Sequence, residues 1–151
     1  MPGRALEVAL DSADAFTFLQ TILLDDVLTT ATAENKPLIG YVSIRVCPHT
    51  GTLLGMKQFR SSVMIEVVAY RSPEAGTVMD RIQEKAKGFI GLSGQAPLLH
   101  GGLENDKVDS AYLAGTPLGG PFKSAFTAIR NFLKKAHPPV FDNVFTARTG
   151  L

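Results

Sequence analysis

The order of apolar patterns along this 151-residue chain predicts an α+β domain, in which an antiparallel sheet carries helices packed on one face. Two segments, 39–46 and 62–70, alternate apolar and polar residues with the period of two that half-buried strands require. Two others, 12–27 and 73–90, repeat apolar residues every three or four positions, as amphipathic helices do. With a short strand before the first helix and another after the second, the order is the split βαβ or ferredoxin-like pattern.

The first strand and helix are expected at residues 5–10 and from position 12 onward. Asp11 or Ser12 can begin the helix, because either side chain can accept a hydrogen bond from a free backbone N–H of the first turn. The apolar face that we expect the helix to bury consists of Phe16, Leu19, Leu23 and Val27. We expect the helix to weaken at 29–32, where β-branched threonines lose rotamer freedom.

The strand at 39–46 has an apolar side and a polar side. The apolar side, which we expect the helices to bury, consists of Val42, Ile44 and Val46. The polar side, which we expect on the opposite, open face of the sheet, consists of Tyr41, Ser43 and Arg45. In the strand at 62–70, Glu66 can share the open face with them.

The second helix has a clear start at Ser72, Pro73 and Glu74, which supply a cap, a preset φ and a carboxylate at the positive end of the helix dipole. Its predicted apolar stripe consists of Val78, Met79, Ile82, Ala86, Phe89 and Ile90, and glycines at 91 and 94 end it. A strand around Leu98 follows. Beyond it we expect a short helix at 107–114, a helical stripe within 122–133 and an irregular tail.

Composition excludes several classes of protein. A net charge of +1 without a basic cluster gives no reason to expect nucleic-acid binding. The single cysteine, Cys47, rules out an internal disulfide and fits a reducing, cytoplasmic location. We expect no metal site, because no His/Cys ligand spacing occurs. No apolar run is long enough to span a membrane, and the chain has no glycine-rich phosphate loop.

The stretch 98–106 carries the most suggestive chemistry. A short apolar run ends at His100 and is followed by Gly101 and Gly102, which allow a close approach of the backbone to another group. A histidine at the end of a strand is more often structural than catalytic, so this stretch alone decides nothing.

Four stretches in order, 40–45, 62–67, 98–106 and 139–151, resemble the C-terminal substrate-binding (cap) domain of FAD-linked oxidases. The similarity is to the vanillyl-alcohol oxidase superfamily, in its aldonolactone, alditol and sterol oxidase branch, and the four stretches cover nearly the whole chain. One departure is that the family usually has Trp after the histidine, where this chain has Gly101 and contains no Trp at all.

This resemblance implies that residues 1–151 form one substrate-binding domain of an oxidoreductase that acts on an alcohol CH–OH. The substrate would be a sugar lactone, a polyol, a sterol or another small alcohol, and hydride would pass to FAD. The flavin would be held mainly by a flavin-binding domain or subunit outside this chain, so the chain alone would be inactive.

The resemblance also assigns roles to particular residues. Catalytic roles fall on His100 and Arg45, and cofactor contacts on Arg45 and Asn143. Substrate contacts fall on Tyr41, Ser43, Glu66 and Gly101. From the residues alone, Glu66 is expected to pair with Arg45, because a carboxylate among apolar residues is costly unless it is paired. An ordinary cross-strand ion pair on a wet surface explains the same two residues equally well.

A second hypothesis belongs to a different class of function. The chain could be a free-standing ferredoxin-like module without catalysis, which binds a small ligand or forms a homodimer through its open sheet face. Phe141 and Phe145, four residues apart in the tail, either pack on the core or mark a surface that meets a partner.

Overall fold

The computed structural model describes residues 3–50 and 57–101, together with positions 128, 131, 132 and 135. Its elements are β1 (Gly3–Asp11), α1 (Ser12–Thr17), the π-helix η1 (Phe18–Leu28), α2 (Thr29–Ala33), β2 (Gly40–Pro48), β3 (Ser61–Tyr70), α3 (Pro73–Gly88) and β4 (Leu98–Gly101). The helix expected at 107–114, most of the stripe expected at 122–133 and the tail with Asn143 lie outside the described residues.

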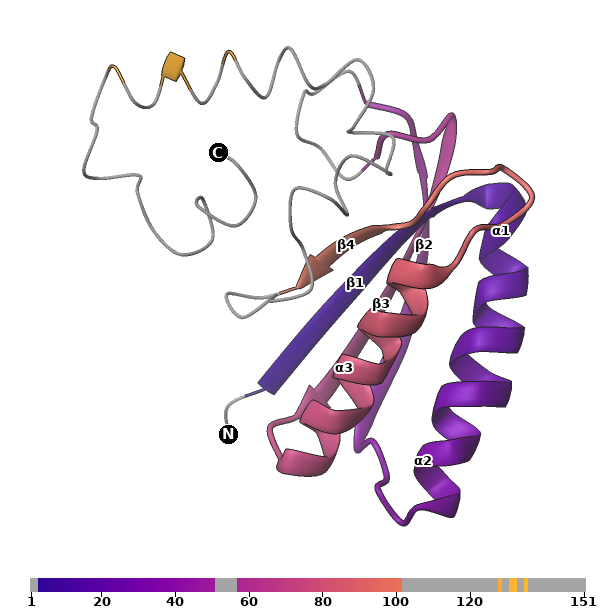
Figure 1. Ribbon diagram of the computed structural model, residues 1–151, viewed down its shortest axis with the longest axis vertical. Coiled ribbons are helices and arrows are strands. Elements are labelled where there is room, and N and C mark those ends of the chain that lie inside the picture. Colours follow the sequence, from indigo (N-terminus) through magenta and orange to yellow (C-terminus); the bar gives the residue numbers. More distant parts are fainter. Residues whose placement is uncertain (1–2, 51–56, 102–127, 129–130, 133–134, 136–151) are drawn as a thin grey trace.

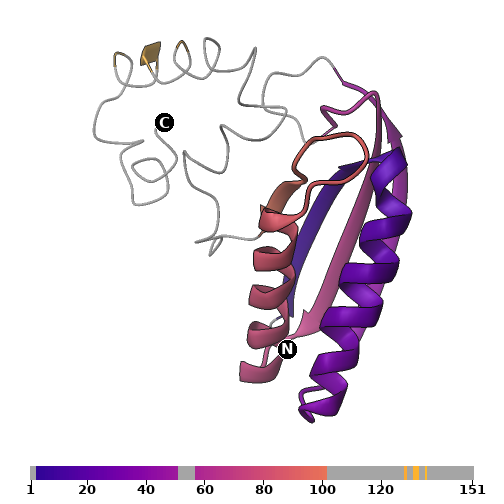
Figure 2. The same cartoon turned by 45° about the vertical axis from the view of Figure 1, so that its right-hand side comes forward.

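The four strands form one antiparallel sheet in the order β2-β3-β1-β4 (Figure 1). The helical column α1–η1–α2 and helix α3 lie side by side against one face of this sheet (Figures 1 and 2). The predicted α+β class, with an antiparallel sheet and helices packed on one face, is therefore confirmed.

The core lies between the sheet and the helices. Alternate residues of β1 and β3 point into it, as the period of two predicts, and they meet apolar side chains of η1 and α3. The strand residues in this core are Leu6, Val8, Leu10, Val63, Ile65, Val67, Ala69 and Leu99. A smaller cluster on the opposite face contains Ala9, Phe59, Met64 and Leu98, with Cys47 packed against it as an apolar filler.

The first helical column buries most of the predicted apolar face, since Leu23 and Val27 are fully buried and Leu19 packs against the core. Asp11 caps it by accepting a hydrogen bond from the Ala13 amide at 2.9 Å. Phe16, predicted to be buried, is exposed, and Phe18 is buried instead, with its ring packed edge-on against Phe89 at 5.3 Å. Phe16 belongs to α1, before η1 begins; within η1 the buried Phe18 and Leu23 are five positions apart, in keeping with the wider turn of a π-helix.

The column also continues where we expected it to weaken. α2 covers Thr29–Ala33, and Ala31 is fully packed in the core. The hydroxyls of Thr29 and Thr32 donate to the carbonyls of Leu24 and Leu28, so these threonines satisfy their polar groups within the helix.

Helix α3 begins as predicted and ends earlier. The Ser72 hydroxyl accepts a hydrogen bond from the Ala75 amide at 3.1 Å, with Pro73 in the first turn. The helix ends at Gly88, so Phe89 packs against the core from outside the helix, and Ile90, predicted to be buried, is exposed.

The prediction that the helices bury the apolar side of β2 is also wrong. Val42, Ile44 and Val46 are paired with the core residues of β3, and therefore lie on the helix side of the sheet as expected. They are nevertheless exposed, since the core under the helices takes residues from β1, β3 and β4 and none from β2. The helices cover the middle of the sheet and leave this edge bare.

A buried carboxylate that the sequence analysis missed joins α1 to the loop after α3. Asp14 is almost fully buried and accepts hydrogen bonds from the amide of Ser93, at 3.2 Å, and from the Ser93 hydroxyl. Gly91 lies so close that a Cβ at this position would be 2.2 Å from the Asp14 carboxylate. The contact holds the loop after α3 against the start of the helical column.

Gly40→Ala tests the close pairing of β2 and β3. A Cβ at position 40 would lie 1.8 Å from the carbonyl oxygen of Val68, which is backbone and cannot move aside alone. We expect this substitution to lower the free energy of unfolding by about 1–3 kcal/mol, measured by urea denaturation. Gly88→Ala is the matched control, since nothing lies within 4 Å of its Cβ position. Equal stabilities of the two variants would contradict the account.

Candidate functional site

One row of paired positions crosses all four strands at the level of the predicted site. His100 of β4 is paired with Glu7 of β1, Glu7 with Glu66 of β3, and Glu66 with Ser43 of β2. Directly opposed residues of an antiparallel sheet share a face. Three residues singled out from the sequence, far apart along the chain, therefore belong to one row, together with Glu7, which the sequence analysis missed.

Arg45 connects the carboxylates of this row. Its guanidinium donates to the carboxylate of Glu7 and lies 3.9 Å from Oε2 of Glu66. The Ser43 hydroxyl donates to the same Oε2 at 3.1 Å. The Arg45 side chain is 55% exposed, whereas those of Glu7 and Glu66 are 15% and 30% exposed. One side of the guanidinium therefore remains open to solvent while the other holds the two acids.

Two carboxylates lie in the row, and one guanidinium lies near both of them. Glu7 and Glu66 are directly opposed, and like charges in that position repel. One guanidinium lies near both, so Arg45 offsets part of the repulsion. The predicted partner of Arg45 was Glu66; its closer partner is Glu7. The sequence signal for Glu7 was a lone carboxylate between Ala5 and Ala9 on the polar side of β1, but only the register shows which strand it faces.

The remaining predicted site residues are placed as follows. Tyr41 lies on the same face as the row, opposite Val68, and its side chain is exposed. Gly101 is paired with Leu6, one position beyond His100 in β4. Asn143 is outside the described residues. The row thus includes Ser43, Glu66 and position 100, and Arg45 and Tyr41 lie beside it on β2.

The chemistry available at this face is hydrogen bonding and charge. Glu7 and Glu66 supply acceptor oxygens, Ser43 a hydroxyl, and the exposed side of Arg45 a cation with several donors. Such groups suit a ligand with hydroxyls or a partial negative charge. Within 3–50 and 57–101, no group of three or more His, Cys, Asp or Glu side chains is arranged to hold a metal ion.

Two hollows lie elsewhere, near the start of α3. One, of about 450 Å³, is lined by Arg4, Arg71, Pro73 and Asp80, among others. The other, of about 380 Å³, is lined by Asn35, Ile39, Tyr70 and Glu74, among others. Neither includes a residue of the row, and both are open surface depressions at the end of a helix.

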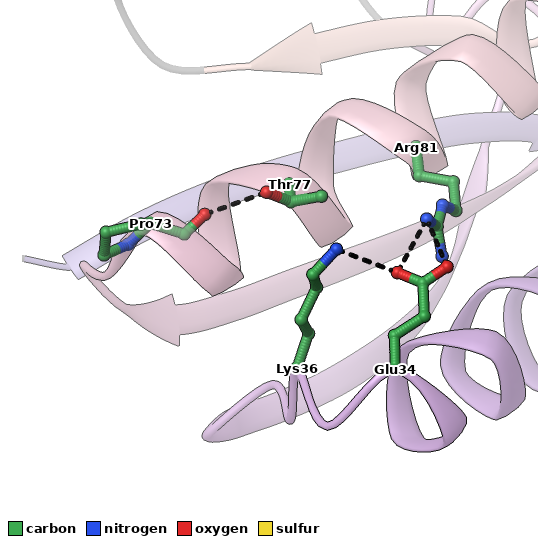
Figure 3. Close-up of polar contacts among 5 residues, drawn as sticks. All are labelled: Glu34, Lys36, Pro73, Thr77 and Arg81. Atoms are coloured by element: carbon green, nitrogen blue, oxygen red, sulfur yellow. Dashed lines mark hydrogen bonds and ion pairs between the residues drawn. The ribbon is translucent and has the colours of Figure 1, made fainter.

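A second polar cluster joins the helices (Figure 3). Both carboxylate oxygens of Glu34, at the end of α2, accept hydrogen bonds from Arg81 of α3 at 3.1 Å, and Lys36 donates to one of them at 3.0 Å. These hydrogen bonds, from Lys36 first and then from Arg81, hold the pKa of Glu34 below its ordinary value of 4.5. The cluster is a structural link between α2 and α3.

Comparison with known proteins adds no family to this description. No protein-family model and no curated protein match the chain. Among the described residues, no helix is long and apolar enough to cross a membrane.

Arg45→Ala tests the balance of charge in the row. Removing the guanidinium leaves two opposed carboxylates, so we expect the free energy of unfolding at pH 7 to fall by about 1 kcal/mol. The additional change Glu7→Gln removes one of the facing charges and should restore part of the loss. Thermal and urea unfolding of the single and double variants would show this. A double variant no more stable than Arg45→Ala would contradict the bridging role.

Glu34→Gln tests the link between the helices through its pH dependence. Because the pKa of Glu34 is lowered in the folded state, its ionised form stabilises the protein above the unfolded pKa, and this contribution is lost as the pH falls through the folded pKa. The wild type should therefore lose melting temperature more steeply than the variant below about pH 4.5. Asp80→Asn, on the same helix, serves as a control. Parallel pH profiles of wild type and Glu34→Gln would refute the link.

Proposed function

We propose that this chain is the substrate-binding (cap) domain of an FAD-dependent oxidoreductase of the vanillyl-alcohol oxidase superfamily, and that its substrate is a small alcohol. Within the α+β class, we propose that the fold is ferredoxin-like. The observation that carries the proposal is the polar row on the sheet face opposite the helices. It gathers the residues to which the family resemblance assigned the chemistry, on a face that no described helix covers.

The residues of the row suit an alcohol substrate. Carboxylates of Glu7 and Glu66 can accept hydrogen bonds from substrate hydroxyls, and the Ser43 oxygen, which donates its proton to Glu66, can accept one from a further substrate hydroxyl. In the proposal the exposed side of the Arg45 guanidinium faces the oxygen of the reacting CH–OH group. There it stabilises negative charge that develops as the hydroxyl proton leaves. Tyr41, exposed beside the row, provides an apolar ring and a hydroxyl for the rest of the substrate.

Position 100 has the proton-transfer role in this proposal. Oxidation of the alcohol removes a hydride from the carbon and a proton from the hydroxyl, and leaves a carbonyl product. FAD, when bound by its own domain, supplies the acceptor for the hydride and its two electrons. His100 accepts the hydroxyl proton and passes it on to solvent. Gly101, beside it, leaves room for the substrate where the family has a bulky aromatic residue.

The residues of this face are compatible with a flavin that is bound by another domain and lies against this face. A reduced flavin carries negative charge, and the Arg45 guanidinium beside the row is a cation that is 55% exposed. The chain has no glycine-rich phosphate loop to hold the rest of a dinucleotide, so the main flavin surface belongs to a separate domain or subunit. The open sheet face is then the surface that meets this domain.

The alternative is a free-standing ferredoxin-like module without catalysis. It is favoured by the bare apolar edge of β2, which suits association with another chain. Under this alternative the polar row binds a small hydroxylated ligand or is only a cross-strand ion-pair cluster.

The deciding experiment is anaerobic reduction of FAD in the enzyme that contains this chain, identified by reading the neighbouring coding sequence for a flavin-binding domain. A panel of sugar lactones, polyols and sterols would be mixed with the enzyme and the loss of flavin absorbance followed. We expect one class to reduce the flavin, and Arg45→Gln and His100→Ala to slow reduction by about 100-fold or more.

Arg60→Gln is the matched control, because Arg60 is an exposed arginine outside the row and should leave the rate unchanged. The proposal fails if no flavin-binding partner is encoded, if the isolated chain binds FAD stoichiometrically, or if both row variants reduce the flavin at the wild-type rate.

A further inference from the structure

Among the described strands, β2 forms the long edge of the sheet and has few residues that would prevent pairing with another chain. Within the part of the chain that the structure describes, β2 pairs with β3 on one side and with no strand on the other. It is nine residues long. The other edge, β4, covers only four residues. Edge strands normally carry lysines, prolines or bulges that prevent pairing with another chain. β2 carries no lysine; its protective residues are one arginine, Arg45, which is engaged with Glu7, and Pro48 at its last position.

The backbone groups that face this edge can be assigned from the ladder with β3. The Tyr70 amide donates to the Ile39 carbonyl at 3.0 Å, which makes these two residues a hydrogen-bonded pair. Hydrogen bonding alternates along an antiparallel ladder, so Tyr41, Ser43 and Arg45 direct their N–H and C=O groups to β3. The groups of the intervening residues, at 42, 44 and 46, point outward.

The same three residues carry exposed apolar side chains. Val42 is 37% exposed, Ile44 52% and Val46 74%, all on the helix side of the sheet. An edge that combines outward backbone groups with β-branched apolar side chains is a template for pairing with another strand.

We propose that this edge pairs with the same edge of a second copy of the chain, which forms a homodimer with a continuous sheet through both subunits. The two β2 strands run antiparallel about a two-fold axis, with Ile44 opposite Ile44 of the second copy. In this register Val42 lies opposite Val46 of the second copy, and Val46 opposite its Val42. Every outward apolar side chain then meets another, as a self-complementary interface requires.

The charges beside this edge favour pairing with a second copy of the chain in this register. The axis through Ile44 places each Arg45 opposite Ser43 of the other copy, next to the Glu66 that Ser43 contacts. Each row, with two carboxylates and one guanidinium, thereby gains a second guanidinium at its end. An axis through position 45 would set the two arginines against each other, and an axis through position 43 would leave Val46 opposite Gly40.

The pairing is compatible with the function proposed above and does not rest on it. Strand addition extends the sheet sideways, so the second copy does not cover the face that carries the row. The contact is small, so we expect association at micromolar concentration and not an obligate dimer.

The test is the molar mass of the full chain in solution, measured by sedimentation equilibrium over a range of concentrations. We expect the wild type to approach the mass of two chains and Ile44→Lys to remain at the mass of one, since two like charges would face each other across the axis. Leu92→Lys is the control, because Leu92 is 87% exposed and belongs to the loop between α3 and β4, and it should dimerise like the wild type. Circular dichroism checks that each variant is folded.

A second measurement tests the register and does not depend on Ile44→Lys folding. In a Cys47→Ser background, Ile44→Cys should form an intermolecular disulfide under mild oxidation at least about 10-fold faster than Leu92→Cys, because only the former lies beside its own copy. A wild type that stays monomeric at all concentrations, a dimer that survives Ile44→Lys, or equal oxidation rates of the two cysteine variants would overturn the proposal.

Discussion

The arrangement of this protein's open face depends on one guanidinium placed between two carboxylates that the sheet register forces together. Glu7 and Glu66 are opposed across the central strand pair, and Arg45 of the neighbouring strand contacts the first and lies near the second. Without a cation at that point the pairing of β1 with β3 would bring two negative charges together. The same contact fixes where Arg45 presents its exposed side, and so where a ligand could meet a positive charge.

The fold follows from this central pair of strands. β1 and β3 are buried on the helix side along most of their length, and the two helical columns lie over them. The edge strand β2 receives less cover, which is why it keeps three apolar side chains in solvent on the same side of the sheet. The two faces are therefore unlike: one carries the helices, and the other carries the polar row beside a small cluster around Phe59.

Much of this could be predicted from the sequence, because local patterns carry it. The alternation in β3 and the start of α3 at Ser72 and Pro73 are properties of neighbouring residues, and the structure confirms them. In the first helical column the predicted face was right for Leu19, Leu23 and Val27, which lie in or against the core, and wrong for Phe16, which is exposed. The prediction that the apolar side of β2 is buried was wrong, because alternation shows which way a side chain points but not how far the helices extend.

The candidate site was only partly predictable. Ser43, Arg45 and Glu66 could be placed on one face from alternation alone. Glu7 could not be matched to them, because its pairing with Glu66 and with position 100 depends on long-range register that no local pattern encodes. The buried contact between Asp14 and Ser93 is of the same kind, as it joins residues far apart in the chain.

The most direct measurement of the central claim is an experimental structure of this chain bound to its flavin-binding domain, with FAD and an alcohol substrate present. The account predicts that the flavin ring lies over the sheet face opposite the helices and that the Arg45 guanidinium and the side chain at position 100 contact the substrate oxygen. A flavin placed against the helices, or a substrate remote from the row formed by positions 100, 7, 66 and 43, would contradict it.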